Sequence, residues 1–231
     1  MKQEIEFGSE TIQFKLEYSQ RKTLGITVTP GMEVIVKSPV DATEEKIKEK
    51  LRLRAPWILK QQSYFLAFHP KAIEKKYLAG ETHYYLGRQY RLQIIAGSSD
   101  SVKLKGKFLE VTTSDKTTIE NVVKTWYLQH AKLKFNQIAK PLIQQFKKYN
   151  VEPSTIMLRH MPSRWGSCTP NGKIILNPEL IKAPKRCIEY VIIHELCHLI
   201  HHDHTRKFLD LQSKEMPDWA KWKNKLEKML A

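Results

Sequence analysis

One short segment of this 231-residue chain has the residue types and the spacing to bind a metal ion and activate water. It reads His-Glu-Leu-Cys-His and runs from His194 to His198. Residues four apart on a helix are separated by about 400° of rotation, so the two imidazoles project from one face and can bind one ion. Glu195 would lie beside that ion, where its carboxylate could accept a proton from water. We therefore expect a zinc site with His194 and His198 as ligands.

A zinc site that catalyses a reaction needs a third protein ligand and an open position for water. An unbroken helix favours His201, which lies about 700° from His194 and therefore on the same face. A break at His202 and Asp203 would instead bring His204 to the metal, because aspartate favours caps and turns over helix interiors. The spacing alone leaves both possibilities open.

Residues on either side of the motif could complete the site. Arg159 and Arg164 flank a predicted strand, and either guanidinium could bind a substrate carboxylate or stabilise an oxyanion, as could the His201 imidazole. A structural ion pair is the alternative for each arginine. Further along the chain, Asp210 and Glu215 could accept a hydrogen bond from a ligand histidine.

The elements that must position these residues are predicted to be a small sheet and a helix. Short apolar runs indicate strands at 155–158, 163–169 and 173–176. Asn-Gly at positions 171 and 172 favours a hairpin turn between the last two of these strands. A helix that carries the motif is expected to begin after Pro184.

A long amphipathic helix is predicted from residue 115 to about residue 149, because apolar residues recur at helical spacing from Ile119 onward. Residues 121–150 contain six lysines and no acidic residue, which indicates a basic helix face. Such a face is ordinarily solvated, and contact with an anionic partner is the alternative.

The first half of the chain is predicted to be rich in strands. Ile12, Phe14, Leu16 and Tyr18 alternate with other residues, as in a half-buried strand. We therefore expect an α+β fold in two parts. Residues 1–114 would form a strand-rich region with a helix at about 42–68, and residues 115–231 would form the part that carries the metal site.

The composition bears on location and partners. Lysine and arginine number 39 against 24 aspartates and glutamates, which gives a net charge of +15. Residues 1–150 carry +11 of that charge, outside the metal-binding segment, so nucleic acid or a nucleotide is a possible partner of the N-terminal half. The apolar runs are too short to span a membrane. Three cysteines at no disulfide-framework spacing, and no apolar segment after Met1, predict a cytoplasmic protein.

Further segments form motifs around the metal-binding helix, namely Arg159, Ser163–Cys168 (Ser-Arg-Trp-Gly-Ser-Cys), Ile175, Asn177, Tyr190–His198, and His204 followed by Phe208. Others lie in the N-terminal half: Arg21–Val36, Trp57-Ile58 and Tyr85–Arg88. With these residues the chain resembles the YgjP-like family of small zinc metallopeptidases, relatives of the minigluzincin and SprT-like proteins. The sequence departs from the usual family pattern at Asp203 and Leu209, neither of which is a ligand position.

The resemblance implies a zincin-like metallopeptidase domain with a small sheet, and it implies that His194, His198 and His204 are the zinc ligands. It also implies that Glu195 is the general base in the hydrolysis of a peptide or protein substrate. Two alternatives keep the metal site. The chain could hydrolyse nucleotide phosphoanhydrides, although it has no Gly-rich phosphate loop, or it could be a protease associated with nucleic acid.

Overall fold

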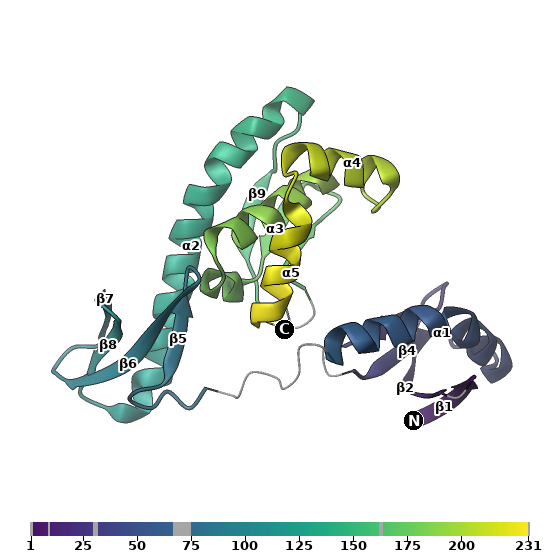
Figure 1. Ribbon diagram of the computed structural model, residues 1–231, viewed down its shortest axis with the longest axis horizontal. Coiled ribbons are helices and arrows are strands. Elements are labelled where there is room, and N and C mark those ends of the chain that lie inside the picture. Colours follow the sequence, from purple (N-terminus) through teal and green to yellow (C-terminus); the bar gives the residue numbers. More distant parts are fainter. Residues whose placement is uncertain (1, 9, 30–31, 67–74, 162–163, 231) are drawn as a thin grey trace. The chain divides into compact units, whose positions relative to one another are not determined.

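The computed structural model describes residues 2–8, 10–29, 32–66, 75–161 and 164–230 (Figure 1). The chain divides into two compact units, one of residues 1–72 and one of residues 73–230. Each unit has its own hydrophobic core.

The N-terminal unit is a four-stranded sheet covered by one helix. The strands are β1 (Lys2–Phe7), β2 (Glu10–Tyr18), β3 (Gly25–Val28) and β4 (Val34–Ser38), in the order β1-β2-β4-β3. Strands β2 and β4 run parallel, and the other pairs are antiparallel. The helix α1 (Glu44–Leu66) packs on this sheet and contains Pro56 without ending there. The last two residues of the predicted helix, 67 and 68, lie outside the described residues.

Every second side chain of β2 points into the core of this unit. Ile12, Phe14 and Leu16 are buried, as the sequence predicts, and they pack against apolar residues of α1. Tyr18 does not continue the pattern, because it is 50% exposed at the end of the strand. The buried face of α1 consists of Ile47, Leu51, Ala55 and Ile58.

The second unit begins with a sheet of β5 (Thr82–Tyr85), β6 (Arg88–Ala96), β7 (Ser101–Lys105) and β8 (Phe108–Thr113), in the order β5-β6-β8-β7. This sheet shares one hydrophobic core with α2 (Ile119–Phe146). The hydroxyl of Tyr127 in α2 also donates a hydrogen bond to the carbonyl of Tyr84 at 2.7 Å. The compact units therefore divide at residue 72 and not at the predicted 114, because β5–β8 pack with the following helices.

The sheet beside the motif is three-stranded. It consists of β9 (Thr155–Leu158), β10 (Gly166–Cys168) and β11 (Lys173–Leu176), in the order β10-β11-β9. Strands β10 and β11 form the predicted hairpin, and Gly172 in its turn has a φ of +70°. Ser163, at the start of the predicted strand, lies outside the described residues.

Three helices follow this sheet: α3 (Lys185–His198), α4 (Arg206–Glu215) and α5 (Trp219–Leu230). Figure 1 shows α3 between the long helix α2 and the two C-terminal helices. Helix α3 contacts α2, α4, α5 and strand β10, so it is the central element of the second unit. The mixture of sheets and helices confirms the predicted α+β class.

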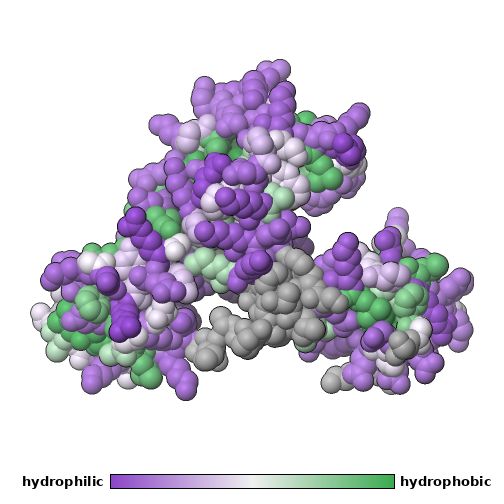
Figure 2. Space-filling view, viewed as in Figure 1, coloured by the Kyte–Doolittle hydropathy of each residue, from purple (hydrophilic) through white to green (hydrophobic). Residues whose placement is uncertain are grey.

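The visible surface is mostly hydrophilic (Figure 2), in keeping with a mean hydropathy of −0.47. Among the described residues, no helix combines the length and the apolar character that crossing a membrane requires.

Candidate metal centre

Three histidine side chains converge at the end of α3. His194 and His198 belong to the last turns of that helix, and His204 comes from the loop before α4. The Nε2 atom of His194 lies 3.3 Å from Nε2 of His198 and 3.0 Å from Nε2 of His204. All three rings offer ligand atoms within 4.8 Å of one another, so together they could hold one metal ion.

The point at which α3 ends selects the third histidine. The helix stops at His198, earlier than the break considered at His202 and Asp203, and a loop then returns the chain to the centre at His204. His201 takes part through its backbone, since its carbonyl oxygen lies 3.1 Å from Nδ1 of His198. Its imidazole is not one of the three converging rings.

Hydrogen bonds on the far side of two rings fix their orientation. The Nδ1 of His194 lies 2.8 Å from Oε1 of Gln212, which is 1% exposed, and the Nδ1 of His198 faces the His201 carbonyl. Both partners are acceptors, so each Nδ1 carries the proton and each Nε2 presents a lone pair. Two lone pairs 3.3 Å apart repel each other unless a cation lies between them. The donor set therefore fits a metal ion.

Burial favours the neutral forms of His194 and His198. It lowers the pKa of His194 to about 4, and repulsion from His198 and His204, when those rings carry a proton, acts in the same direction while the bond to Gln212 opposes it. Burial also lowers the pKa of His198. Beneath the rings, the fully buried Phe208 of α4 packs against all three, with centroid distances of 4.6–5.0 Å.

Glu195 lies one residue after the first histidine and is 5% exposed. Burial raises the pKa of its carboxyl to about 8, while the charge of Arg164 and a hydrogen bond from the Cys168 backbone N–H both act to lower it. The carboxylate lies directly under β10, since a Cβ atom at Gly166 would be 2.5 Å from its Oε1. Glycine at this position is what allows the strand to approach the carboxylate so closely.

The two arginines singled out from the sequence lie in different places. Arg164 is exposed, close enough to Glu195 for its charge to act on that carboxyl. Arg159 is also exposed, but its described contact is made by its backbone N–H, which donates to the carbonyl of Leu176 at 3.1 Å. The structure thus brings Arg164 close to the centre, whereas no contact among the described residues links the Arg159 side chain to it.

The hydrogen-bond acceptor for His194 is Gln212 and not Asp210 or Glu215. Asp210 pairs with Arg206 on the surface. Glu215 is buried and accepts hydrogen bonds from elsewhere, at the junction of α4 and α2. Gln212 could be found from the sequence, because it lies four residues after Phe208 and is therefore a polar residue on the apolar face of a predicted helix.

Asn177 is a second residue whose role the sequence did not reveal. It is 3% exposed, and its Nδ2 donates to the carbonyls of Met161 at 2.8 Å and Arg164 at 3.2 Å. Its backbone N–H donates to the carbonyl of Trp165 at 2.9 Å. These bonds hold the segment that carries Arg164 and leads into β10.

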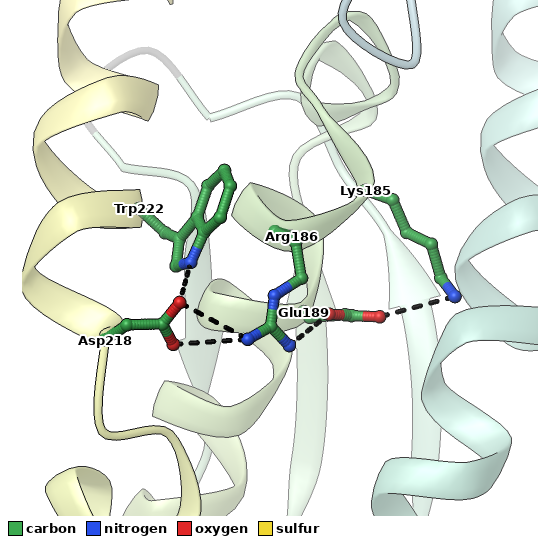
Figure 3. A network of polar contacts seen from close by, with 5 residues as sticks. All are labelled: Lys185, Arg186, Glu189, Asp218 and Trp222. Carbon is green, nitrogen blue, oxygen red and sulfur yellow. Dashed lines mark hydrogen bonds and ion pairs between the residues drawn. The ribbon is translucent and has the colours of Figure 1, made fainter.

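A charged network braces the other end of α3 against α5 (Figure 3). Arg186 donates to Glu189 at 2.9 Å and to Asp218 at 3.2 Å, and Asp218 also accepts a bond from the indole N–H of Trp222 at 2.6 Å. Lys185 lies 3.4 Å from the second oxygen of Glu189. This end of the helix is remote from the histidines, so the network bears on the placement of α5 and not directly on the metal centre.

A helix that offers two histidines and a buried glutamate, completed by a third histidine from the next loop, defines a site of the metallohydrolase class. A comparison with protein families agrees with this: the model of the YgjP-like metallopeptidase domain matches residues 22–229. The chain therefore belongs to the YgjP-like metallopeptidase family, and that membership implies a metal cofactor. Comparison with curated proteins gave no match.

Proposed function

We propose that the protein is a zinc-dependent peptidase in which His194, His198 and His204 bind the ion. The observation that supports this most is the convergence of three Nε2 atoms beside a buried glutamate. Three imidazole nitrogen donors suit zinc and leave a fourth position open. When bound, zinc would act as a Lewis acid that polarises the scissile carbonyl and lowers the pKa of water.

Glu195 is the general base of the proposed reaction. A cation held by the three histidines would favour the ionised form of this carboxyl against the effect of burial. The carboxylate takes a proton from the attacking water and delivers it to the leaving amine. Contact with Gly166 and the N–H of Cys168 hold the carboxylate in one orientation, which is what a positioned base requires. Arg164 is the better placed of the two arginines to assist, either at a substrate carboxylate or at the developing oxyanion.

The outer edge of β10, which no described strand covers, offers a place for an extended peptide. The backbone N–H of Asn177, just after β11, donates to the carbonyl of Trp165, just before β10. The backbone groups of every second residue of β10 therefore face β11. The backbone of Gly166 consequently faces away from the sheet, directly beside Glu195. A substrate that paired with this edge would bring its backbone past the general base.

The test is a screen of a terminally blocked peptide library by mass spectrometry, with zinc-loaded protein and a Glu195→Gln variant. We expect cleavage by the native protein, a loss of about 10³-fold or more in the variant, and retention of the bound zinc by both. His194→Ala is the matched variant that should lose zinc as well as activity. An unchanged rate in Glu195→Gln would contradict the mechanism.

A nucleotide phosphohydrolase is the second candidate, and the charge around the centre favours it. The charge of Arg164, before β10, lowers the pKa of Glu195, and the charge of Lys223 in α5 lowers the pKa of His194. Two cationic side chains from different parts of the unit therefore act on the site. Such a rim would attract a polyphosphate. Nucleoside triphosphates belong in the same screen, and their hydrolysis without any peptide cleavage would replace the first proposal by this one.

Two further proposals concern a binding partner and the location of the protein in the cell. The basic face of α2 could hold nucleic acid, in which case retention on DNA should weaken steeply with salt. The cysteines Cys168, Cys187 and Cys197 are all free, which suits the reducing cytoplasm.

A further inference from the structure

The second outer strand of the three-stranded sheet, β9, has an edge that no described strand covers. The backbone N–H of Arg159 donates to the carbonyl of Leu176 in β11. Because backbone groups alternate in direction along a parallel ladder, the N–H and C=O of Met157 also face β11. The intervening residues, Ile156 and Leu158, therefore direct their backbone N–H and C=O groups outward. Unpaired strand edges of this kind accept additional strands.

A groove of about 400 Å³ lies between β9 and α2. Its lining is mainly apolar, and two of its side chains are unusually exposed for their type: Leu128 at 50% and Met157 at 47%. The residues that line it are Leu128, Lys132, Phe135 and Asn136 of α2 and Ile156, Met157 and Leu158 of β9. Side chains of an added strand would thus have an apolar surface to cover.

The groove also carries a positive charge that no described carboxylate neutralises. Four of the six lysines in 121–150 contact a polar partner, namely Lys124, Lys134, Lys147 and Lys148. In the part of the chain that the structure describes, Lys132 has no carboxylate within 4.0 Å, and it is the lysine that lines the groove. An acidic side chain in the groove would complement it.

We propose that this groove binds an extended segment of a partner protein, which adds to β9 as a strand and places an acidic side chain at Lys132 and an apolar one at Leu128. A second copy of this chain suits the groove poorly, because each copy carries a net charge of +15. The binding edge is on the opposite side of the sheet from β10, so it is separate from the proposed catalytic edge.

The test uses the full chain as its zinc-loaded Glu195→Gln variant, so that the probes are not cleaved. The probe is a fluorescent, terminally blocked hexapeptide of alternating valine and glutamate, and the comparison peptide has lysine in place of glutamate. Anisotropy should show that the glutamate peptide binds about tenfold or more tightly than the lysine peptide. Equal affinity for the two peptides, or no binding of either, would overturn the proposal.

Two controls separate this groove from other surfaces. Lys132→Glu should remove or reverse the preference, whereas Lys140→Glu, which changes another lysine of α2 outside the lining, should preserve it. N-methylation of one alternate set of peptide residues should abolish binding, and methylation of the other set should not. An equal effect of the two lysine variants, insensitivity to methylation, or concentration-dependent dimerisation that excludes the probe would each contradict the inference.

Discussion

The Oε1 of Gln212 lies 2.8 Å from the Nδ1 of His194 and comes from the helix that follows the third histidine. Helix α4 therefore orients a side chain of α3, in addition to supplying Phe208 beneath the cluster. The two helices act together on one imidazole, so the geometry of the centre depends on how α4 is held.

Removal of this acceptor should weaken metal binding. We expect Gln212→Ala to lower the zinc affinity about 10- to 100-fold, because His194 loses the bond that fixes its ring and tautomer. Competition against a chromophoric chelator measures the change. Gln212→Glu, which keeps an acceptor, should bind much more tightly than the alanine variant, and Asp210→Ala on the exposed side of α4 should have little effect. Equal affinities of the native protein and Gln212→Ala would contradict this role.

A methyl group at Gly166 should disturb the proposed general base, Glu195, and leave metal binding unchanged. The added Cβ would lie 2.5 Å from Oε1 of Glu195, so the carboxylate must move. We expect Gly166→Ala to lower kcat by about 10²-fold, as misplacement of a catalytic group commonly does, with an unchanged zinc content. Ser167→Ala, the next residue on the strand, is the control. The prediction fails if kcat is preserved in Gly166→Ala.

Glu215 should contribute measurably to stability. Its buried carboxylate accepts bonds from Gln145 at 2.7 Å, Lys148 at 3.0 Å and Tyr149 at 2.5 Å. Burial opposes its ionisation, but these bonds outweigh burial and lower its pKa. We expect Glu215→Ala to lower the free energy of unfolding by about 2–4 kcal/mol in denaturant titrations.

The stability that Glu215 contributes should depend on pH. Its folded pKa is lowered, so its contribution is present above the unfolded pKa of about 4.3 and is lost as the pH falls through the folded pKa. The exposed Glu152, which lies 3.6 Å from Lys147, provides the control, and Glu152→Ala should cost less than about 1 kcal/mol. Similar losses of unfolding free energy in Glu215→Ala and Glu152→Ala would contradict the stabilising role of the buried Glu215 bonds.

His83 should make the second unit less stable in mild acid. It is 3% exposed, and burial lowers its pKa to about 4, with Glu81 opposing the shift. Between pH 6.5 and 4 the unfolded chain binds a proton that the folded chain does not, so stability falls as the pH is lowered through this window. The loss should approach about 3 kcal/mol. The free energy of unfolding of the metal-free native protein should therefore fall more steeply with decreasing pH in this window than that of His83→Gln. Parallel curves for the two proteins would exclude His83 as the cause.

Zinc should stabilise one unit and leave the other unchanged. All three proposed ligands belong to residues 73–230, so an ion bound there is linked to the folding of that unit. Zinc at 100 times its dissociation constant should add about 2.7 kcal/mol to the unfolding free energy of the second unit. Calorimetry with and without a chelator should show this, and a shift confined to residues 1–72 would contradict the site.

The sequence predicts those parts of the site that depend on local geometry. His194 and His198 follow from helical spacing, and Asn171-Gly172 from turn preference. The choice between His201 and His204 does not follow, because it depends on where α3 ends in the folded chain. The bond between His194 and Gln212 joins residues 18 apart, on two helices whose packing no local pattern specifies.

The domain boundary illustrates the same limit on a larger scale. The sequence pattern places the change at residue 114, where predicted strands give way to a predicted helix. Packing instead joins them, since Leu109 and Val111 share a core with Val123 and Trp126. A core of this kind is a property of the tertiary contacts, and neither strand nor helix patterning records which elements will meet.

The complete burial of Phe208 has a consequence for how an ion would enter the site. Its ring is fixed by the hydrophobic core, so the surface on which the three imidazoles rest is shaped before any metal arrives. Loading would then require little rearrangement of the chain, because the support of the three rings is already in place. The readiness of the site for an ion would accordingly depend on the packing of an aromatic side chain that binds none.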